Sequence, residues 1–303
     1  VDHVLQASFT NTNTKNVRLV RGSHIVVNKL YDHDKSFICQ NDDGRIFFMI
    51  PYEDKFTLIG TTDIDHSRSA SEVEISEEEK QYICDSANTY LNSEIKLSDI
   101  VWSYSGVRPL YDDGASKAQE ATRDYVIKAE EHDSSLMINI FGGKITTYRR
   151  LSEAILKHIE TFLGQRGNPW TDNSSLPGGD FDVDGLFDLN NKIQEKYPFL
   201  NDEIVKRLVR SYGTVSFDIF ASAKNIESLG ESFGSGLYEK EVVYLVQNEW
   251  ARTSEDILFR RSKLGLSLTK NEKQKLDQFL EKYQKLSKTS ESSVKQDNIV
   301  ETV

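Results

Sequence analysis

The chain has 303 residues, of which 38% are hydrophobic and 28% charged, and this ordinary soluble composition is enough for about two domains with packed cores. The formal net charge of −11 argues against nucleic-acid binding through a broadly basic surface, although a local basic pocket for a small anion is compatible with it. The two cysteines, Cys39 and Cys84, lie in no Cys-x-x-Cys pattern and indicate a reduced, cytosolic protein. The sequence has neither a signal peptide nor an apolar run near the roughly 18 residues that cross a bilayer.

From its start, the chain predicts a helix over 1–9 and then a series of strands with one helix inserted among them. The turn at 41–44, Asn-Asp-Asp-Gly, is typical of a β-hairpin. Ser76 and Glu79 form a capping-box pattern at the start of the inserted helix. Runs rich in β-branched and aromatic residues predict strands at 17–20, 24–28, 37–40, 45–51, 56–61, 101–110, 125–129 and 136–141.

The second half of the chain has a different pattern. A stretch at 165–180, dense in Gly, Pro and polar residues, predicts a linker. Beyond it, helices are predicted at 183–195, 201–212, 216–223, 237–248, 254–260 and 269–285. We therefore expect an α+β protein with a mostly antiparallel sheet domain over 1–164, a helical domain over 181–287 and a polar, disordered tail over 288–303.

The segment 141–150 is the first candidate for a functional site. An apolar strand ends at Phe141 in two glycines, and Lys144 and two threonines follow before an amphipathic helical pattern. A helix start offers free backbone N–H groups and a positive dipole end, and glycine lets a ligand come close to the backbone. The segment is either part of a cofactor site or an ordinary glycine turn with a lysine in solvent.

Three further positions place basic side chains at predicted strand ends: His24, Arg108 and Arg123. Each has a structural alternative, because a lone histidine is commonly a core residue and an arginine commonly pairs with a nearby carboxylate, here Asp112, Asp113 or Asp124. Taken together, convergent Arg and Lys side chains suit a small phosphate or carboxylate, and a histidine beside them suits proton transfer. The residues alone predict an anion-binding, enzyme-like site.

Nine motifs then occur in one order along the chain: RGSHIVV (21–27), IGTTD (59–63), WSYSGVRPL (102–110), TRDY (122–125), FGGKITTYR (141–149), LPGG (176–179), YPFL (197–200), LGE (229–231) and EWAR (249–252). Through them residues 17–285 resemble the C-terminal part of FAD-dependent glycerol-3-phosphate dehydrogenases, the aerobic, membrane-associated bacterial enzymes. The resemblance implies that 1–164 combines an antiparallel-sheet substrate domain with a remnant of an FAD-binding α/β domain.

The resemblance also implies an activity: oxidation of sn-glycerol 3-phosphate to dihydroxyacetone phosphate, with a hydride passing from C2 to FAD and electrons passing on to a membrane quinone. It assigns catalytic roles to His24 as a base, to Arg108, and to Lys144 near the flavin ring. Arg108 and Arg123 are expected to bind the substrate, Arg123 through the phosphate. Thr62 and Asp63 are expected to have a structural role, and no metal site is predicted. The expected contacts to the cofactor are Gly106, Val107, Gly143, Lys144, Ile145 and Thr146.

One departure from the family concerns the dinucleotide-binding turn G-x-G-x-x-G, which this sequence lacks. Its G-x-G at 234–236 has Glu239 in the third glycine position and no strand before it. We therefore expect that the N-terminal segment that binds the ADP part of FAD is missing, that the sequence is a fragment of a longer protein, and that this chain alone binds FAD weakly or not at all and is inactive.

Two other functions stay open at this stage. One is a glycerol-3-phosphate oxidase, which passes electrons to oxygen, and the other is a non-catalytic module whose acidic helical region docks a protein. The expected partners are glycerol 3-phosphate and a membrane quinone, without nucleic acid, and the oligomeric state is open, a homodimer included. The expected location is cytoplasmic, with peripheral attachment to the inner face of the cell membrane as the alternative.

Overall fold

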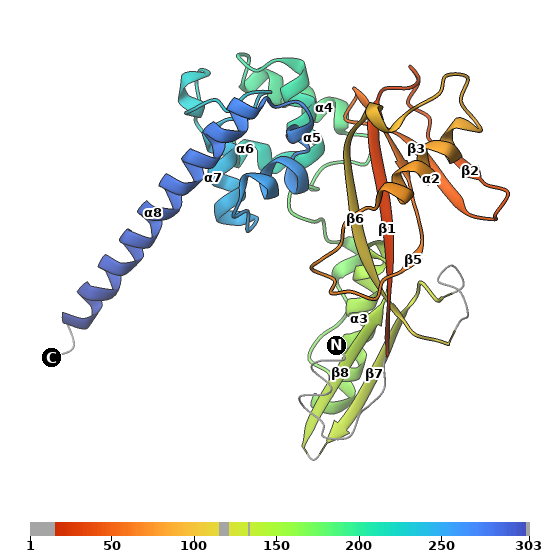
Figure 1. Cartoon of the computed structure of the whole chain (residues 1–303). Coiled ribbons are helices and arrows are strands. Elements are labelled where there is room, and N and C mark those ends of the chain that lie inside the picture. The colour runs from red at the N-terminus through yellow and green to blue at the C-terminus, as the bar shows by residue number, and fades with distance from the viewer. Residues whose placement is uncertain (1–15, 115–120, 133, 301–303) are drawn as a thin grey trace. The chain divides into compact units, whose positions relative to one another are not determined.

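The computed structural model describes residues 16–114, 121–132 and 134–300, shown as coloured ribbons in Figure 1. The helix predicted over 1–9 lies outside the described residues. The chain divides into two compact units, with the boundary between Asn173 and Ser174. Each unit has its own buried core.

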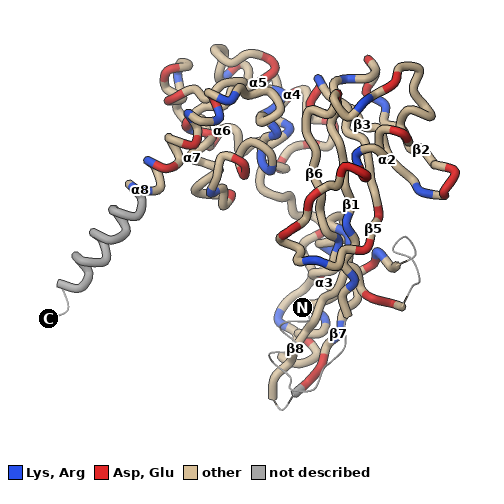
Figure 2. The backbone as a smooth tube through the Cα atoms, in the orientation of Figure 1, with Lys and Arg blue, Asp and Glu red and all other residues tan. Residues whose placement is uncertain are grey.

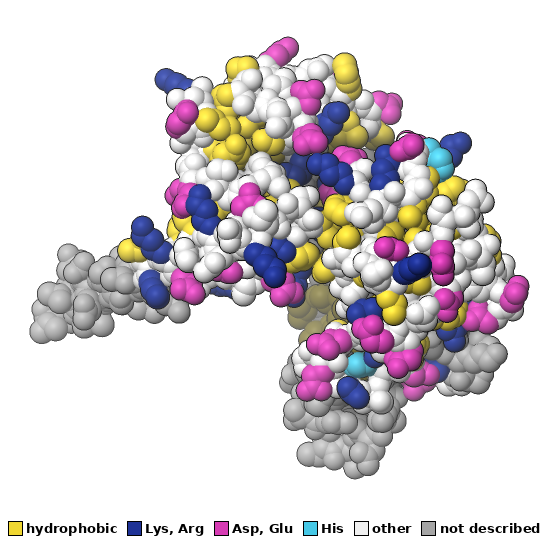
Figure 3. Space-filling view, turned by 45° about the horizontal axis from the view of Figure 1, so that its top comes forward, with side chains coloured by type: hydrophobic (Ala, Val, Ile, Leu, Met, Phe, Trp, Pro, Cys, Tyr) yellow, Lys and Arg dark blue, Asp and Glu magenta, His cyan; other side chains and the backbone are white. Residues whose placement is uncertain are grey.

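Charged residues of both signs are interspersed along the chain. Figure 2 shows Lys and Arg positions between Asp and Glu positions in both units. On the face seen in Figure 3, both signs are spread among scattered hydrophobic side chains.

The first unit is built on a six-stranded antiparallel sheet, as expected from the sequence. The order is β2-β3-β4-β1-β5, and β6 also pairs with β1. The strands are β1 (Val17–Asn28), β2 (Phe37–Gln40), β3 (Ile46–Tyr52), β4 (Phe56–Gly60), β5 (Ile64–Asp65) and β6 (Ile100–Tyr111).

β1 is one continuous strand where the sequence predicted two, 17–20 and 24–28. The predicted break at the Arg21–Ser23 segment is wrong because β6 pairs with β1 across it, with Gly22 opposite Gly106 and His24 opposite Tyr104. A glycine pair weakens a strand locally, but the flanking ladder holds it in place. This long pairing sets the register between β1 and β6, and so the positions of His24 and Arg108 relative to each other.

One face of the sheet is covered by helix α2 (Glu77–Asn88). The predicted capping box is present, since Ser76 accepts from the backbone N–H of Glu79 and the Glu79 carboxylate accepts from the backbone N–H of Ser76. The core between helix and sheet contains Ile25, Val27, Phe47, Met49, Ile59, Ile83, Cys84 and Ala87.

A two-stranded ribbon follows, formed by β7 (Tyr125–His132) and β8 (Ser135–Gly142). After β8 the chain makes a short 3₁₀ turn, Ile145–Thr147, and then helix α3 (Tyr148–Leu163). The sequence predicted a helical pattern after Lys144 and the two threonines, and α3 begins directly after Thr147, as expected.

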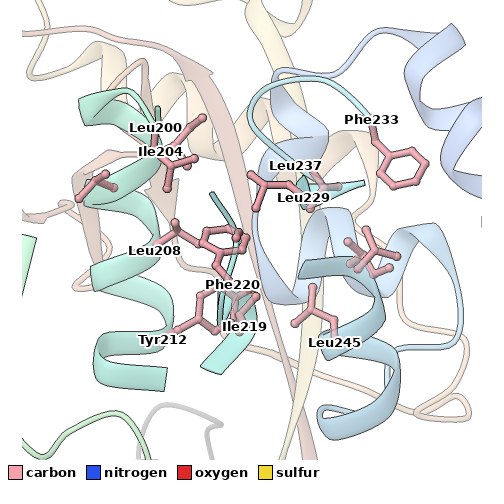
Figure 4. Close-up of a cluster of buried hydrophobic side chains, with 14 of the residues drawn as sticks. Leu200, Ile204, Leu208, Tyr212, Ile219, Phe220, Leu229, Phe233, Leu237 and Leu245 are labelled. Atoms are coloured by element: carbon pink, nitrogen blue, oxygen red, sulfur yellow. The ribbon is translucent and has the colours of Figure 1, made fainter. Parts of the chain in front are cut away.

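The second unit is helical, as expected. Its helices are α4 (Leu186–Lys196), α5 (Asp202–Tyr212), α6 (Ser216–Phe220), α7 (Glu239–Asn248), a π-helical turn (Asp256–Arg261) and α8 (Lys270–Val300). Their apolar faces form one buried cluster, in which Leu208, Phe220 and Leu245 are fully enclosed (Figure 4). A buried ion pair, Arg207 with Glu241, links α5 to α7 beside this cluster.

The division between the two units falls inside the predicted linker, 165–180. The first part of this stretch, up to Asn173, belongs to the first unit, where Arg149 of α3 donates to Thr171 and Thr171 donates to Glu153. The rest of the predicted linker belongs to the second unit, where Thr214 donates to the carbonyl of Gly178.

The tail predicted to be disordered from Lys288 is helical to Val300, as a continuation of α8. Extending an existing helix adds one hydrogen bond for each residue fixed and needs no new nucleation.

Candidate active site

Five of the predicted site residues line one cavity of about 320 Å³ in the first unit. They are Val107, Arg108, Arg123, Gly143 and Lys144, joined by Pro109 and Leu110 of β6. The cavity therefore gathers two arginines and a lysine from three separate segments of the chain: the end of β6, the approach to β7 and the turn after β8.

The glycine pair brings the turn after β8 onto β6. Gly142 and Gly143 have φ angles of 64° and 91°, in the left-handed region that favours glycine. A Cβ on Gly142 would lie 3.4 Å from the backbone nitrogen of Tyr111, and one on Gly143 would lie 3.1 Å from Cβ of Tyr125. This close approach places Lys144 at the cavity with Arg108 and Arg123.

Both arginines share one carboxylate that the sequence did not suggest. Nη1 of Arg108 donates to Oδ1 of Asp63 at 2.9 Å, and Nη2 of Arg123 donates to Oδ2 at 3.0 Å. The structure pairs both arginines with Asp63 instead of the predicted alternatives Asp112, Asp113 and Asp124. Asp63 directly precedes β5, and the pairing of β1 with both β5 and β6 brings it to Arg108.

Two glycines leave space for the side chains of Arg108 and His24. A Cβ added to Gly22 would lie 2.3 Å from Nη1 of Arg108, so the guanidinium lies directly against the β1 backbone. A Cβ added to Gly60 would lie 2.5 Å from Cδ2 of His24, its partner across the β1–β4 pairing.

His24 is half-buried and stacked on Tyr104, with ring centroids 5.0 Å apart and planes 8° from parallel. Its Nδ1 is buried and finds no hydrogen-bond partner among the described residues. Burial, assisted by the positive charge of Arg108, lowers the pKa of His24 to about 4. The imidazole is therefore neutral at physiological pH, and the same shift makes it a weaker base than an ordinary histidine.

The opposite face of β1 is held by a buried carboxylate. Glu79 of α2 accepts hydrogen bonds from the hydroxyls of Ser23 and Thr62 and pairs with Arg21 at 2.8 Å. This network, which includes Thr62, holds β1 on the face of the sheet opposite the cavity.

The remaining predicted cofactor contacts flank the cavity without lining it. Gly106 lies opposite Gly22 on an exposed stretch of β6, and a Cβ there would meet nothing within 4 Å. Ile145 and Thr146 are exposed in the 3₁₀ turn beside Lys144, and Ile145 is 86% exposed.

The geometry thus offers an anion site with a neutral imidazole on the adjoining strand. The described part of the chain contains no group of His, Cys, Asp or Glu side chains arranged to hold a metal ion. None of its helices has the length and apolar character required to cross a membrane.

Comparison with known proteins identifies relatives of this chain. Residues 2–149 match the family of FAD dependent oxidoreductases, and residues 169–293 match the C-terminal domain of alpha-glycerophosphate oxidase. The chain is 40% identical over 273 residues to D-erythritol 1-phosphate dehydrogenase of Brucella abortus, covering 90% of this chain and 54% of that protein. It is 39% identical over 277 residues to the aerobic glycerol-3-phosphate dehydrogenase of Escherichia coli, covering 90% of this chain and 55% of that protein.

A third relative is the glycerol-3-phosphate dehydrogenase of Pseudomonas aeruginosa, 39% identical over 93% of this chain and 55% of its own length. The chain thus spans about half the length of these curated relatives. Its fold is similar to that of the glycerol-3-phosphate dehydrogenase from Bacillus halodurans complexed with FAD, with a TM-score of 0.68 and 23% identity over 93% of this chain and 59% of that one.

These findings confirm the resemblance that the motifs predicted. The two matched domains follow each other in the order of the motifs, and FAD is the cofactor of the family that the first domain matches. Residues 2–149 therefore belong to the FAD-dependent oxidoreductase family, and residues 169–293 form a C-terminal domain of the alpha-glycerophosphate oxidase type.

Proposed function

We propose that this protein oxidises sn-glycerol 3-phosphate to dihydroxyacetone phosphate in an FAD-dependent reaction. The observation that carries the proposal is the cavity lined by Arg108, Arg123 and Lys144; His24 lies outside this lining, on the adjoining strand β1. Convergent cations suit a phosphate monoester, and the relatives named glycerol-3-phosphate dehydrogenases support this substrate.

The two arginines would bind the phosphate. Each guanidinium presents five N–H donors, and the described contacts to Asp63 and Thr61 leave others for a ligand. The side chains of Arg108 and Arg123 are 32% and 36% exposed, so a substrate can reach them without a change in fold.

His24 and Lys144 would act on the alcohol. A neutral imidazole can take the proton of the C2 hydroxyl, and the ammonium of Lys144 can stabilise negative charge on that oxygen as the proton leaves. The lowered pKa of His24 keeps the imidazole neutral at neutral pH, and neutralisation of Arg108 by a bound phosphate would raise the pKa of the ring and its strength as a base.

The residues around the glycine turn fit the flavin. Gly143 leaves the backbone open, and no side chain caps the 3₁₀ turn or the start of α3, so backbone N–H groups there can face an electron-rich ring. Gly106, Val107, Ile145 and Thr146 would edge the same ligand. When bound, FAD supplies the acceptor for the hydride that leaves C2.

We infer a membrane quinone as the final electron acceptor, because the relatives named above are dehydrogenases. This acceptor would require peripheral attachment to the inner face of the cell membrane, which fractionation of cells would test. Hydrogen peroxide release during turnover would instead favour an oxidase, the name that the C-terminal domain carries.

A second candidate substrate is D-erythritol 1-phosphate, since one relative of equal similarity is named for its oxidation. Both substrates are polyol phosphates, so the arginine pair suits either one. The residues proposed to bind the phosphate do not distinguish the longer carbon chain of erythritol phosphate from that of glycerol phosphate.

The test is steady-state oxidation by the purified full-length protein loaded with FAD, with a soluble quinone as acceptor. We expect turnover of glycerol 3-phosphate to dihydroxyacetone phosphate and none of unphosphorylated glycerol. Faster turnover of D-erythritol 1-phosphate would favour the second candidate. A folded, FAD-loaded protein that oxidises neither phosphate would contradict the proposal and favour a docking role.

A further inference from the structure

We propose that Asp63 is a positioning residue for this oxidation: its carboxylate holds Arg108 and Arg123 in one arrangement and sets the net charge that the phosphate meets. The inference rests on the proposed function and adds to it a residue that neither contributes a proton nor binds the flavin. The relevant geometry is a carboxylate whose two oxygens serve two different arginines.

The bridge connects segments that nothing in the sequence places together. Asp63 lies in the turn between β4 and β5, Arg108 lies near the end of β6, and Arg123 precedes β7. Each arginine reaches the carboxylate from a different segment, at 2.9 Å and 3.0 Å. Removing the bridge would therefore free two side chains at once, and both of them line the cavity.

Burial distinguishes this bridge from an ordinary surface ion pair. The Asp63 side chain is 19% exposed, whereas Asp65, two residues further, is 60% exposed in its pair with Arg18. Exposed pairs contribute little, but two partly buried guanidinium groups close together repel each other unless an anion lies between them. Asp63 supplies that anion while the cavity contains no substrate.

The charge balance fits a phosphate monoester. Arg108, Arg123 and Lys144 are positive and Asp63 is negative, which leaves an excess of two positive charges among these four side chains. A phosphate monoester carries about −1.5 to −2 at neutral pH, so a bound dianion would be neutralised by this set. A neutral residue at position 63 would leave the site with one more positive charge than the ligand needs.

The expected effect of Asp63→Asn follows from these two roles. Loose arginines bind phosphate in several orientations, so kcat for each bound FAD should fall by roughly ten- to a hundredfold. At the same time, inorganic phosphate should inhibit more strongly, by roughly three- to tenfold, because a competing negative charge has been removed. Lower kcat together with tighter phosphate binding is a pattern that partial unfolding does not produce.

Two variants serve as comparisons. Asp63→Glu keeps the charge but lengthens the side chain, so phosphate inhibition should stay near the wild-type value while kcat recovers only in part. Asp65→Asn removes a carboxylate that pairs with Arg18 at the exposed edge of the same sheet, so its kinetics should match the wild type.

The experiment measures kcat for each bound FAD and the inhibition constant of inorganic phosphate in the full-length wild-type protein and these variants. An Asp63→Asn protein with wild-type values of both would overturn the inference. Calorimetric titration with inorganic phosphate repeats the affinity comparison without turnover. If the wild type oxidises no polyol phosphate, the proposed function fails, and unchanged phosphate affinity in Asp63→Asn would then separately overturn the role of Asp63.

Discussion

At the scale of single residues, the site depends on positions where a side chain is absent. Gly22 leaves the space in which the Arg108 guanidinium lies, and Gly60 does the same for the His24 ring. In the sequence alone, these glycines indicate only interruptions of a strand. Their close contacts with Arg108 and His24 follow from the pairing of β6 and β4 with β1.

The substitution Gly22→Ala tests this view. The new methyl would overlap Nη1 of Arg108, and because the arginine is long and flexible, the guanidinium should move while the strand stays in place. We expect KM for glycerol 3-phosphate to rise by roughly tenfold or more, since a charge-assisted phosphate contact is weakened. The free energy of unfolding should change by less than about 1 kcal/mol.

Steady-state kinetics and denaturant unfolding measure the two quantities. Gly167→Ala is the matched control, because a Cβ at Gly167 meets nothing within 4 Å. An unchanged KM in Gly22→Ala would show that substrate binding does not need the Arg108 guanidinium in its position against Gly22 of β1.

The pKa of His24 leads to a second expectation, on stability against pH. The folded-state pKa of about 4 lies below the ordinary value of 6.5, so between these values the unfolded chain binds a proton that the folded chain does not. The neutral ring is compatible with the fold above pH 6.5, and its protonation should favour unfolding increasingly as the pH falls towards 4. His24→Gln should remove this part of the acid sensitivity, of order 1–3 kcal/mol.

Denaturant midpoints of the wild type and His24→Gln, compared from pH 7 down to pH 4.5, provide the measurement. As the pH falls, the denaturant midpoint of the wild type should decrease more than that of His24→Gln. Parallel curves, or an NMR titration of His24 near its ordinary pKa, would contradict the buried, neutral state.

At the scale of elements, local sequence patterns predict local structure, but they do not predict features that depend on the pairing of distant strands. The hairpin turn, the capping box of α2 and the strand that ends at Phe141 depend on neighbours in sequence, and the structure contains all of them. The continuity of β1 depends on its pairing with β6, some eighty residues away, and was missed. The ion pairs of Asp63 with Arg108 and Arg123 could not be predicted for the same reason, because no local pattern connects these residues.

The helical unit has one buried polar cluster whose contribution can be measured. Glu241 is fully buried, accepts two hydrogen bonds from Arg207 and accepts a third from Tyr212 at 2.8 Å. Burial and the adjacent Glu241 raise the pKa of Tyr212, so its phenol stays protonated as a donor. Glu241→Gln would leave the buried guanidinium of Arg207 without its carboxylate and should lower the free energy of unfolding by about 3–5 kcal/mol.

Denaturant unfolding with Glu255→Gln as control separates burial from simple charge loss. Glu255 pairs with Arg260 at an exposed position, and its loss should change stability by no more than about 0.5 kcal/mol. Equal effects of the two substitutions would contradict a special contribution from the buried pair.

At the scale of the whole molecule, the chain combines two matched domains and spans about half the length of its curated relatives. It holds the residues proposed for the flavin ring and the substrate, while its sequence contains no dinucleotide-binding turn for the phosphates of FAD. A site that contacts only part of a cofactor has fewer interactions to offset the loss of ligand freedom on binding.

We therefore expect the 303-residue chain, expressed by itself, to be purified without colour and to bind added FAD weakly. Absorbance spectroscopy of the purified chain and equilibrium dialysis with FAD measure this directly. Flavin retained at near-stoichiometric level would show that the residues present are sufficient for binding.

The most direct test of the central claim, that the cavity with Arg108 and Arg123 is where a polyol phosphate is oxidised, is anaerobic reduction of the flavin in the full-length protein. Glycerol 3-phosphate should bleach the flavin of the wild type rapidly, and Arg108→Ala should slow this by roughly a hundredfold or more at subsaturating substrate, since a buried charge-assisted contact is worth about 2–5 kcal/mol. Arg18→Ala, which removes the partner of the exposed Asp65 and no contact of Arg108 or Arg123, should behave as the wild type. Bleaching as fast in Arg108→Ala as in the wild type would contradict the account.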